Sequence, residues 1–152
     1  MKLIPETIAL AGLAYMGIVI SASLPILPAT IPTHFNAAGA ADGFGPKDML
    51  WHIPFVGLML YALFTVIGVL MNLSKPPTRG MTLDRVISLL GWVKVVMVWT
   101  MAYLVWATIE TALGHITGIN SAFAMMPAVA IVGIAIAHTI GGNKQPRATD
   151  SV

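Results

Sequence analysis

The sequence contains no cysteine and few charged residues. Only 9% of its 152 residues are Asp, Glu, Lys or Arg, and the formal net charge is +2 at pH 7. The lack of cysteine excludes disulfides, thiolate catalysis and cysteine-ligated metals. The eight basic residues form no continuous basic stripe, so we expect no nucleic-acid partner.

Apolar residues are abundant instead. They make up 57% of the chain, and the mean hydropathy is +0.85. A soluble domain usually carries about a quarter charged residues, and a chain of this length cannot hide so much apolar surface from water. The composition therefore predicts an integral membrane protein whose main surroundings are the lipid bilayer.

Four apolar segments are long enough to cross a bilayer as helices, which takes about 20 residues each. The first is too long for the core of a signal peptide, so we expect it to be retained. Pro54 predicts either a kink in the second span or a separate interfacial turn before it. The fold expected is an all-α, four-helix transmembrane bundle over residues 1–142. Its spans are expected at about 3–24, 49–73, 82–113 and 121–140, with a short cytoplasmic tail at 143–152.

The basic residues predict the orientation of these spans. They gather between the second and third spans and after the fourth, as Lys75, Arg79, Arg85, Lys144 and Arg147. The positive-inside rule then places both termini in the cytoplasm. The long segment between the first two spans is expected on the opposite, extracytoplasmic face.

This long segment, residues 24–47, is the main polar interruption of the chain. Its three prolines rule out an ordinary helix over the first half, and its glycines predict turns in the second half. We expect a loop that caps the helix ends, with its shape set by Pro28, Pro32, Phe35, Gly39 and Gly43.

The same segment holds the densest run of hydrogen-bonding side chains. We predict that His34, Asn36, Asp42 and Lys47 bind a ligand or partner, together with Glu110 from the third span. The alternative is that the His, Asn and Asp hold the shape of the loop, and that recognition depends on this shape. Imidazole and carboxylate groups suit a divalent metal or an acid–base pair. The spacing matches no zinc motif, so we predict no metal, no cofactor and no catalytic residue. The weak candidates for a metal are His34, His52 and His115.

Lys94 is unusual because it lies inside the third span. A charge at that depth is unfavourable unless it pairs or reaches the membrane surface. We expect it to extend towards the cytoplasmic surface, bonded to backbone carbonyls, Asn72 or headgroups. A role in ligand or partner binding is the alternative. We identify no acidic residue at the same depth, which argues against an ion-coupled transporter.

Small residues recur every four positions in the last apolar segment, at Gly133, Ala137 and Gly141. Such a ridge lets another helix approach closely. Packing within the bundle is one interpretation of this ridge. The other is contact with a membrane-protein partner or a second copy of the chain.

One set of residues in the long segment forms a recognisable pattern: Leu27-Pro28, Ile31-Pro32-Thr33-His34-Phe35-Asn36, Gly39, Asp42-Gly43 and Lys47. This pattern resembles the signature of a bacterial membrane domain of unknown function that occurs in SdpI-type immunity proteins. The resemblance covers about residues 14–72. It implies a location in the bacterial inner membrane. It also implies protection against a membrane-active peptide toxin, or sequestration of a transcriptional repressor, although the larger SdpI proteins have additional spans.

Three functions are consistent with these features. We favour a non-enzymatic protein of the immunity or signalling type, whose extracytoplasmic loop recognises a ligand, peptide or partner. An accessory or structural subunit of a larger membrane complex is the first alternative. The second is a membrane enzyme or transporter that uses His34, Asp42 and Glu110 on the outer face.

Overall fold

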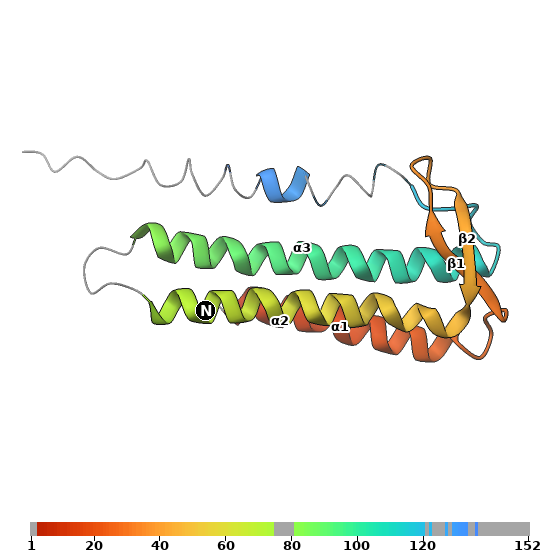
Figure 1. The fold of residues 1–152 in the computed structure, drawn as a ribbon, viewed down its shortest axis with the longest axis horizontal. Coiled ribbons are helices and arrows are strands. Elements are labelled where there is room, and N and C mark those ends of the chain that lie inside the picture. The colour runs from red at the N-terminus through yellow and green to blue at the C-terminus, as the bar shows by residue number, and fades with distance from the viewer. Residues whose placement is uncertain are drawn as a thin grey trace, which may run out of the picture.

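The computed structural model describes residues 3–74 and 81–120, together with 122, 127, 129–133 and 136. Three long helices lie side by side, and a two-stranded sheet lies across one end of them (Figure 1). We call this end the hairpin end. The opposite end, where α2 stops and α3 starts, is the α2–α3 end.

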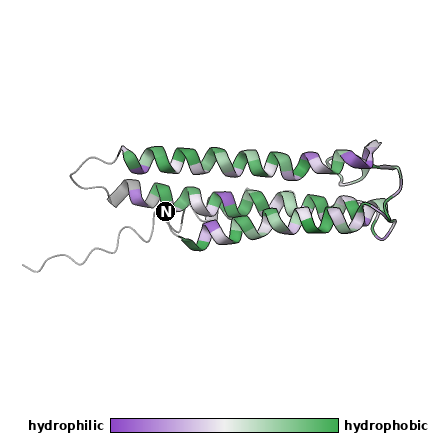
Figure 2. Ribbon diagram, turned by 90° about the horizontal axis from the view of Figure 1, so that it is seen from below, coloured by the Kyte–Doolittle hydropathy of each residue, from purple (hydrophilic) through white to green (hydrophobic). Residues whose placement is uncertain are grey.

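The helices follow the apolar segments closely. α1 covers Leu3–Ser23, α2 covers His52–Leu73 and α3 covers Met81–Ala112. All three are long and apolar enough to cross a membrane, and they are the spans found among the described residues. Figure 2 shows that hydrophobic residues cover most of their length. The prediction of an integral membrane protein is supported, while most of the expected fourth span lies outside the described residues.

A short 3-10 helix, η1, covers Lys47–Trp51 and leads directly into α2. Pro54 is therefore the third residue of α2, in the first turn, where a missing N–H costs no helical hydrogen bond. Of the two alternatives predicted from Pro54, the structure has a turn before α2, although this turn continues directly into the helix.

The helices pack around α3, which contacts α1 and α2 extensively, whereas α1 and α2 contact each other much less. The core joins α1 to α3 through fully buried apolar residues such as Met16, Val98 and Val105. Gly12 allows this close approach, because a Cβ at that position would lie 2.8 Å from a methyl group of Val98. Most large side chains of α2 are exposed, as expected for a helix that faces lipid.

The long segment between α1 and α2 is not an irregular loop. It contains β1, Thr30–Phe35, and β2, Ala41–Pro46, which pair antiparallel. The prediction of an all-α fold was therefore incomplete. Pro32 and the glycines of β2 lower the local strand propensity. The strands form because they pair with each other and because β1 packs on α3 and η1.

Candidate functional site

The turn of the hairpin is held by its own residues. The side-chain oxygen of Asn36 accepts hydrogen bonds from the backbone N–H groups of Ala38, at 2.9 Å, and Ala40, at 3.1 Å. The N–H of Asn36 donates to the carbonyl of Ala40 at 2.9 Å. Asn36 thus shapes the turn, as asparagine commonly does through its own neighbouring backbone.

The tip of the turn is joined to the segment that follows α3. The N–H of Ile119 donates to the carbonyl of Gly39 at 2.8 Å, and Ala40 forms an isolated bridge with Gly118. Gly39 has a positive φ of 83°, and a Cβ there would lie 1.9 Å from the carbonyl oxygen of Ile119. Only glycine fits this position without displacing the backbone.

Lys47 ties the base of the hairpin to the end of α1. Its ammonium donates to the carbonyl of Leu24 at 2.8 Å and to that of Leu27 at 3.4 Å. These carbonyls follow the last turn of α1, where unpaired carbonyls attract a positive charge. Ile31 and Leu50 add buried apolar contacts beside them. The hairpin is therefore attached to the helix ends at both its tip and its base.

His34 and Asp42 form a pair on the exposed surface of the hairpin. The Nδ1 atom of His34 lies 2.5 Å from a carboxylate oxygen of Asp42, and their side chains are 70% and 44% exposed. Gly43 lies against the same histidine, since a Cβ there would be 2.9 Å from the Cβ of His34. Phe44 on β2 is also largely exposed, at 63%.

The other predicted polar residues do not join this pair. The carboxylate of Glu110 pairs instead with Nδ1 of His115 at 2.8 Å, and Nδ1 of His52 lies 3.0 Å from the carbonyl of Met49. Among the described residues, no group of three or more histidine, aspartate or glutamate side chains is placed to hold a metal ion.

The remaining predicted residues are placed as follows. Pro28 is exposed, Pro32 is buried in β1, and Phe35 is half-buried at the end of β1. Gly133 is exposed, while Ala137 and Gly141 lie outside the described residues.

A cavity of about 130 Å³ separates part of the hairpin from the helix ends. It is lined mainly by apolar groups of β1 and η1, such as Ile31 and Met49, and by Thr108 of α3. Its size suits one apolar side chain or a very small molecule, below the usual range of about 300–1,000 Å³ for ligand pockets.

A second polar site lies between the three helices. Lys94 of α3 donates to the carboxylate of Glu6 in α1 at 2.5 Å and to the hydroxyl of Thr65 in α2 at 3.0 Å. Tyr61 of α2 donates to the other carboxylate oxygen of Glu6 at 3.0 Å, and its ring centroid lies 4.8 Å from the Lys94 ammonium. We call these four residues the ion-pair cluster.

The ion-pair cluster corrects the prediction made for Lys94. Its side chain does not reach the membrane surface, because only 2% of it is exposed, and its partner is Glu6 rather than Asn72 or a headgroup. The statement that no acidic residue lies at this depth was also wrong. Glu6 is in the first turn of α1, but α1 begins part-way along α2 and α3, as Figure 1 shows. Its first turn is therefore level with the middle of α3.

The sequence does carry a signal for this pair. Glu6 is the only acidic residue before Asp42, and it lies inside an apolar span, as Lys94 does. Ionisable residues inside membrane spans are energetically unfavourable and usually pair with one another. Two opposite charges in two apolar spans therefore indicate contact, although the sequence does not place them at one depth.

A match to a known family covers the hairpin but not the ion-pair cluster. The cluster residues Glu6, Tyr61, Thr65 and Lys94 all lie outside the matched range. No curated protein and no solved structure matches the chain. Residues 11–58, from the middle of α1 through the hairpin to the start of α2, are similar to a domain of unknown function (DUF1648).

Proposed function

We propose that the chain is a bacterial inner-membrane protein that uses its extracytoplasmic hairpin to recognise a partner, and that the ligand is an extended peptide segment. The main support for this proposal is that the two strands of the hairpin have different neighbours. β1 contacts α3 and η1, whereas β2 has β1 as its main neighbour. The sheet has two strands in the described part of the chain, so β2 forms its outer edge.

An outer edge strand favours peptide binding for a physical reason. Its outward N–H and C=O groups can pair with an added strand, and side chains beside the edge then select the sequence. Phe44 supplies an exposed apolar contact and Asp42 an exposed carboxylate on this strand. The resemblance to SdpI-type immunity proteins agrees with this proposal, since it implies recognition of a membrane-active peptide.

The test is peptide selection against the full chain in lipid nanodiscs. Random extended peptides are displayed, and those that bind are measured again with Phe44→Ala and Asp42→Ala variants. We expect at least tenfold weaker binding to Phe44→Ala. Leu58→Ala, at an exposed position on α2, is the matched control and should bind normally. Selected peptides that bind all four proteins equally would refute recognition by the hairpin.

The orientation and the fourth span form part of the same proposal. The N–H of Asn120 donates to the hydroxyl of Tyr103 at 3.3 Å, so the chain enters the last apolar segment beside the hairpin end of α3. A span over 121–140 would then return to the α2–α3 end, with both termini in the cytoplasm as the positive-inside rule requires. Reporter fusions after Ser74 and after the last residue should both report the cytoplasmic side.

A subunit role is the second candidate, and Gly133 favours it. A Cβ at Gly133 would meet no atom within 4 Å among the described residues, so its backbone is open to another helix. We expect Gly133→Leu to weaken association with a membrane partner or a second copy, without changing peptide binding. An unchanged size in mild detergent would count against this second role.

A further inference from the structure

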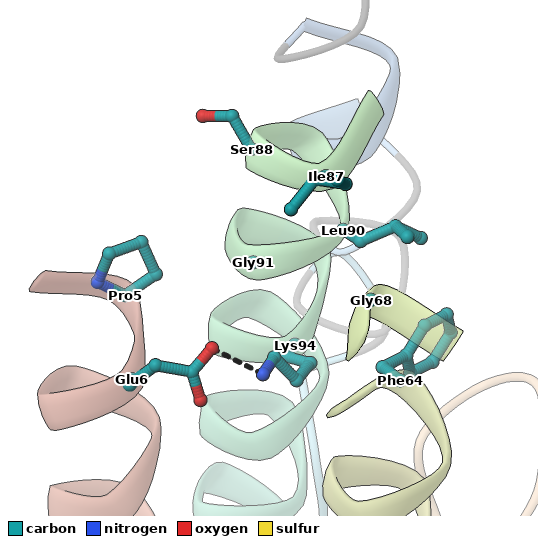
Figure 3. A pocket seen from close by; sticks show the side chains of 9 residues that line it. All are labelled: Pro5, Glu6, Phe64, Gly68, Ile87, Ser88, Leu90, Gly91 and Lys94. Atoms are coloured by element: carbon teal, nitrogen blue, oxygen red, sulfur yellow. Dashed lines mark hydrogen bonds and ion pairs between the residues drawn. The ribbon is translucent and has the colours of Figure 1, made fainter. Parts of the chain in front are cut away.

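Cavities of very different size lie beside the ion-pair cluster and under the hairpin. Figure 3 shows the cavity beside the cluster, where Ser88 points away from the bonded pair of Glu6 and Lys94. Its volume is about 10 Å³, which leaves space for one water molecule at most. The cavity under the hairpin, between β1, η1, the start of α2 and α3, has about 130 Å³ and can hold a small ligand. We call it the hairpin cavity.

The walls of the hairpin cavity are mostly apolar. Ile31 and Pro32 of β1, Leu50 of η1 and Ile53 of α2 form much of them. No Asp, Glu, Lys or Arg is present among the described residues that line it. A charged ligand would lose its water there without gaining a partner of opposite charge, which is unfavourable. The walls therefore favour a neutral and mainly apolar ligand.

The size of the hairpin cavity suits a single aromatic ring. An apolar cavity of about 150 Å³ engineered in another protein binds benzene. Met49 also lines the hairpin cavity, and a thioether makes favourable contacts with aromatic rings. The sulfur of Met49 lies against β2, since a Cβ at Gly45 would be 2.8 Å from it. Both the volume and the lining thus favour a ring of about the size of benzene.

Thr108 of α3 supplies a buried polar group to the same cavity. The residue is only 4% exposed. On the same helix, the hydroxyls of Thr100 and Thr111 donate to the carbonyls four positions before them at 2.7 Å, whereas no such bond holds Thr108 in the described part of the chain. Buried hydroxyls usually have a hydrogen-bond partner, and a threonine hydroxyl can both donate and accept. A ligand with one hydroxyl group would provide this partner.

His52 and Met49 mark the side on which the cavity reaches the surface, because both residues are exposed. The Nδ1 atom of His52 lies 3.0 Å from the carbonyl oxygen of Met49. A carbonyl only accepts hydrogen bonds, so Nδ1 carries the hydrogen, and Nε2 of the neutral ring is an acceptor. The exposed side of the cavity therefore also suits a ligand that carries an O–H group.

We propose that the hairpin cavity binds a phenol, that is, a neutral aromatic ring of about the size of benzene with one hydroxyl group. The ring occupies the apolar space between β1, η1 and α2, and its hydroxyl bonds to that of Thr108. A bound ring contacts both the hairpin and the helices, since both supply the walls. This site is separate from the outer edge of β2, which is proposed to bind a peptide.

Methionine methyl NMR of the full chain in lipid nanodiscs tests binding directly. Phenol is titrated, and the methyl signals of Met49 and Met59 are followed. Met59 on α2 is 58% exposed and is the control for phenol that dissolves in the lipid. We expect the Met49 signal to shift and reach a plateau, while the Met59 signal changes in proportion to the phenol concentration. A Met49 signal that stays unchanged, or that follows Met59, would overturn the proposal.

Thr108→Val tests the hydrogen bond, because it removes the hydroxyl and nearly keeps the shape of the side chain. We expect phenol to bind about threefold to tenfold more weakly, as for the loss of one hydrogen bond. Benzene should bind as before, which also shows that the cavity is intact. Thr100→Val is the matched control and should bind both molecules normally, since the Thr100 hydroxyl is bonded within α3. An unchanged affinity for phenol, or an equal loss for benzene, would contradict the role of Thr108.

A phenol ring can belong to a free molecule or to a tyrosine side chain, and N-acetyl-tyrosinamide separates these sources. A plateau of the Met49 signal with both compounds shows that the cavity admits a tyrosine side chain. A plateau with phenol alone assigns the site to a free small molecule, and a plateau with neither overturns the proposal. Both compounds are measured without peptide, so the outcome does not depend on recognition by the edge of β2.

Discussion

The hairpin holds its polar side chains at the surface, whereas the ion-pair cluster holds them between helices. Both hold polar side chains in a chain that is mostly apolar. In the hairpin, Asn36 bonds residues two and four positions away, and His34 pairs with a residue eight positions away, at the surface. In the cluster, Glu6 and Lys94 are 88 positions apart, and their side chains are 15% and 2% exposed. The surface pair leaves its groups available to a partner, whereas the buried pair joins three helices.

The two regions also differ in how much their ion pairs contribute to stability. An exposed pair remains solvated, so its contribution to stability is small. A buried pair has lost its water, and removal of one partner leaves an uncompensated charge. We therefore expect substitutions in the two regions to differ in their effects on stability, in the order given below.

The largest effect is expected from Lys94→Met. It leaves the Glu6 carboxylate, which is only 15% exposed, with Tyr61 as its remaining donor among the described residues. We expect the free energy of unfolding to fall by about 3–5 kcal/mol. Titration with a denaturing detergent in lipid micelles measures this change. The double variant Glu6→Leu with Lys94→Met removes both charges and should recover most of the loss. If the double variant is less stable than Lys94→Met, the two residues do not act as a pair.

Gly39→Val should have the next largest effect. A side chain at this positive φ is strained, and its Cβ would collide with the carbonyl of Ile119. We expect the stability to fall by about 1–3 kcal/mol, with the effect confined to the hairpin end. Hydrogen exchange should show faster exchange at Ile119 and an unchanged rate in the middle of α3. Gly17→Ala is the control, because a Cβ there meets nothing within 4 Å.

Lys47→Met removes the bonds from the ammonium to the carbonyls of Leu24 and Leu27. Methionine keeps most of the apolar length, so the change isolates these bonds. We expect a loss of about 1.5 kcal/mol, as for hydrogen bonds to a charged group. The loss should be observed as faster exchange at the base of the hairpin. An unchanged exchange rate at the Lys47 amide, which donates to Ala29, would show that the ammonium does not hold the base.

The smallest effect on stability is expected from His34→Ala. Its pair with Asp42 is well exposed, so the loss should stay below about 1 kcal/mol. Titration with a denaturing detergent measures the free energy of unfolding of His34→Ala, and its comparison with Lys94→Met shows how the two regions differ. A loss as large as that of Lys94→Met would mean that the hairpin pair is structural.

The helices could be predicted well from the sequence, because a long apolar run is almost sufficient to locate a membrane-spanning helix. α1, α2 and α3 begin and end within three residues of the expected spans. The turn at Asn36 and Gly39 also follows from local residue types. The strands were missed because their residues have a low propensity for strand structure. They form because β1 and β2 pair with each other. The pair of Glu6 and Lys94 was missed because its depth depends on where α1 starts relative to α3, which only packing determines.

The most direct test of the central claim is the affinity of a selected peptide for Phe44→Ala, measured together with its stability in the same lipid. The outer edge of β2, which carries no third strand among the described residues, is proposed to bind the peptide, while β1 on the inner side of the hairpin packs on α3 and η1. We therefore predict at least tenfold weaker binding with an unchanged free energy of unfolding. Unchanged binding, or weaker binding that only follows a loss of stability, would contradict recognition by this edge.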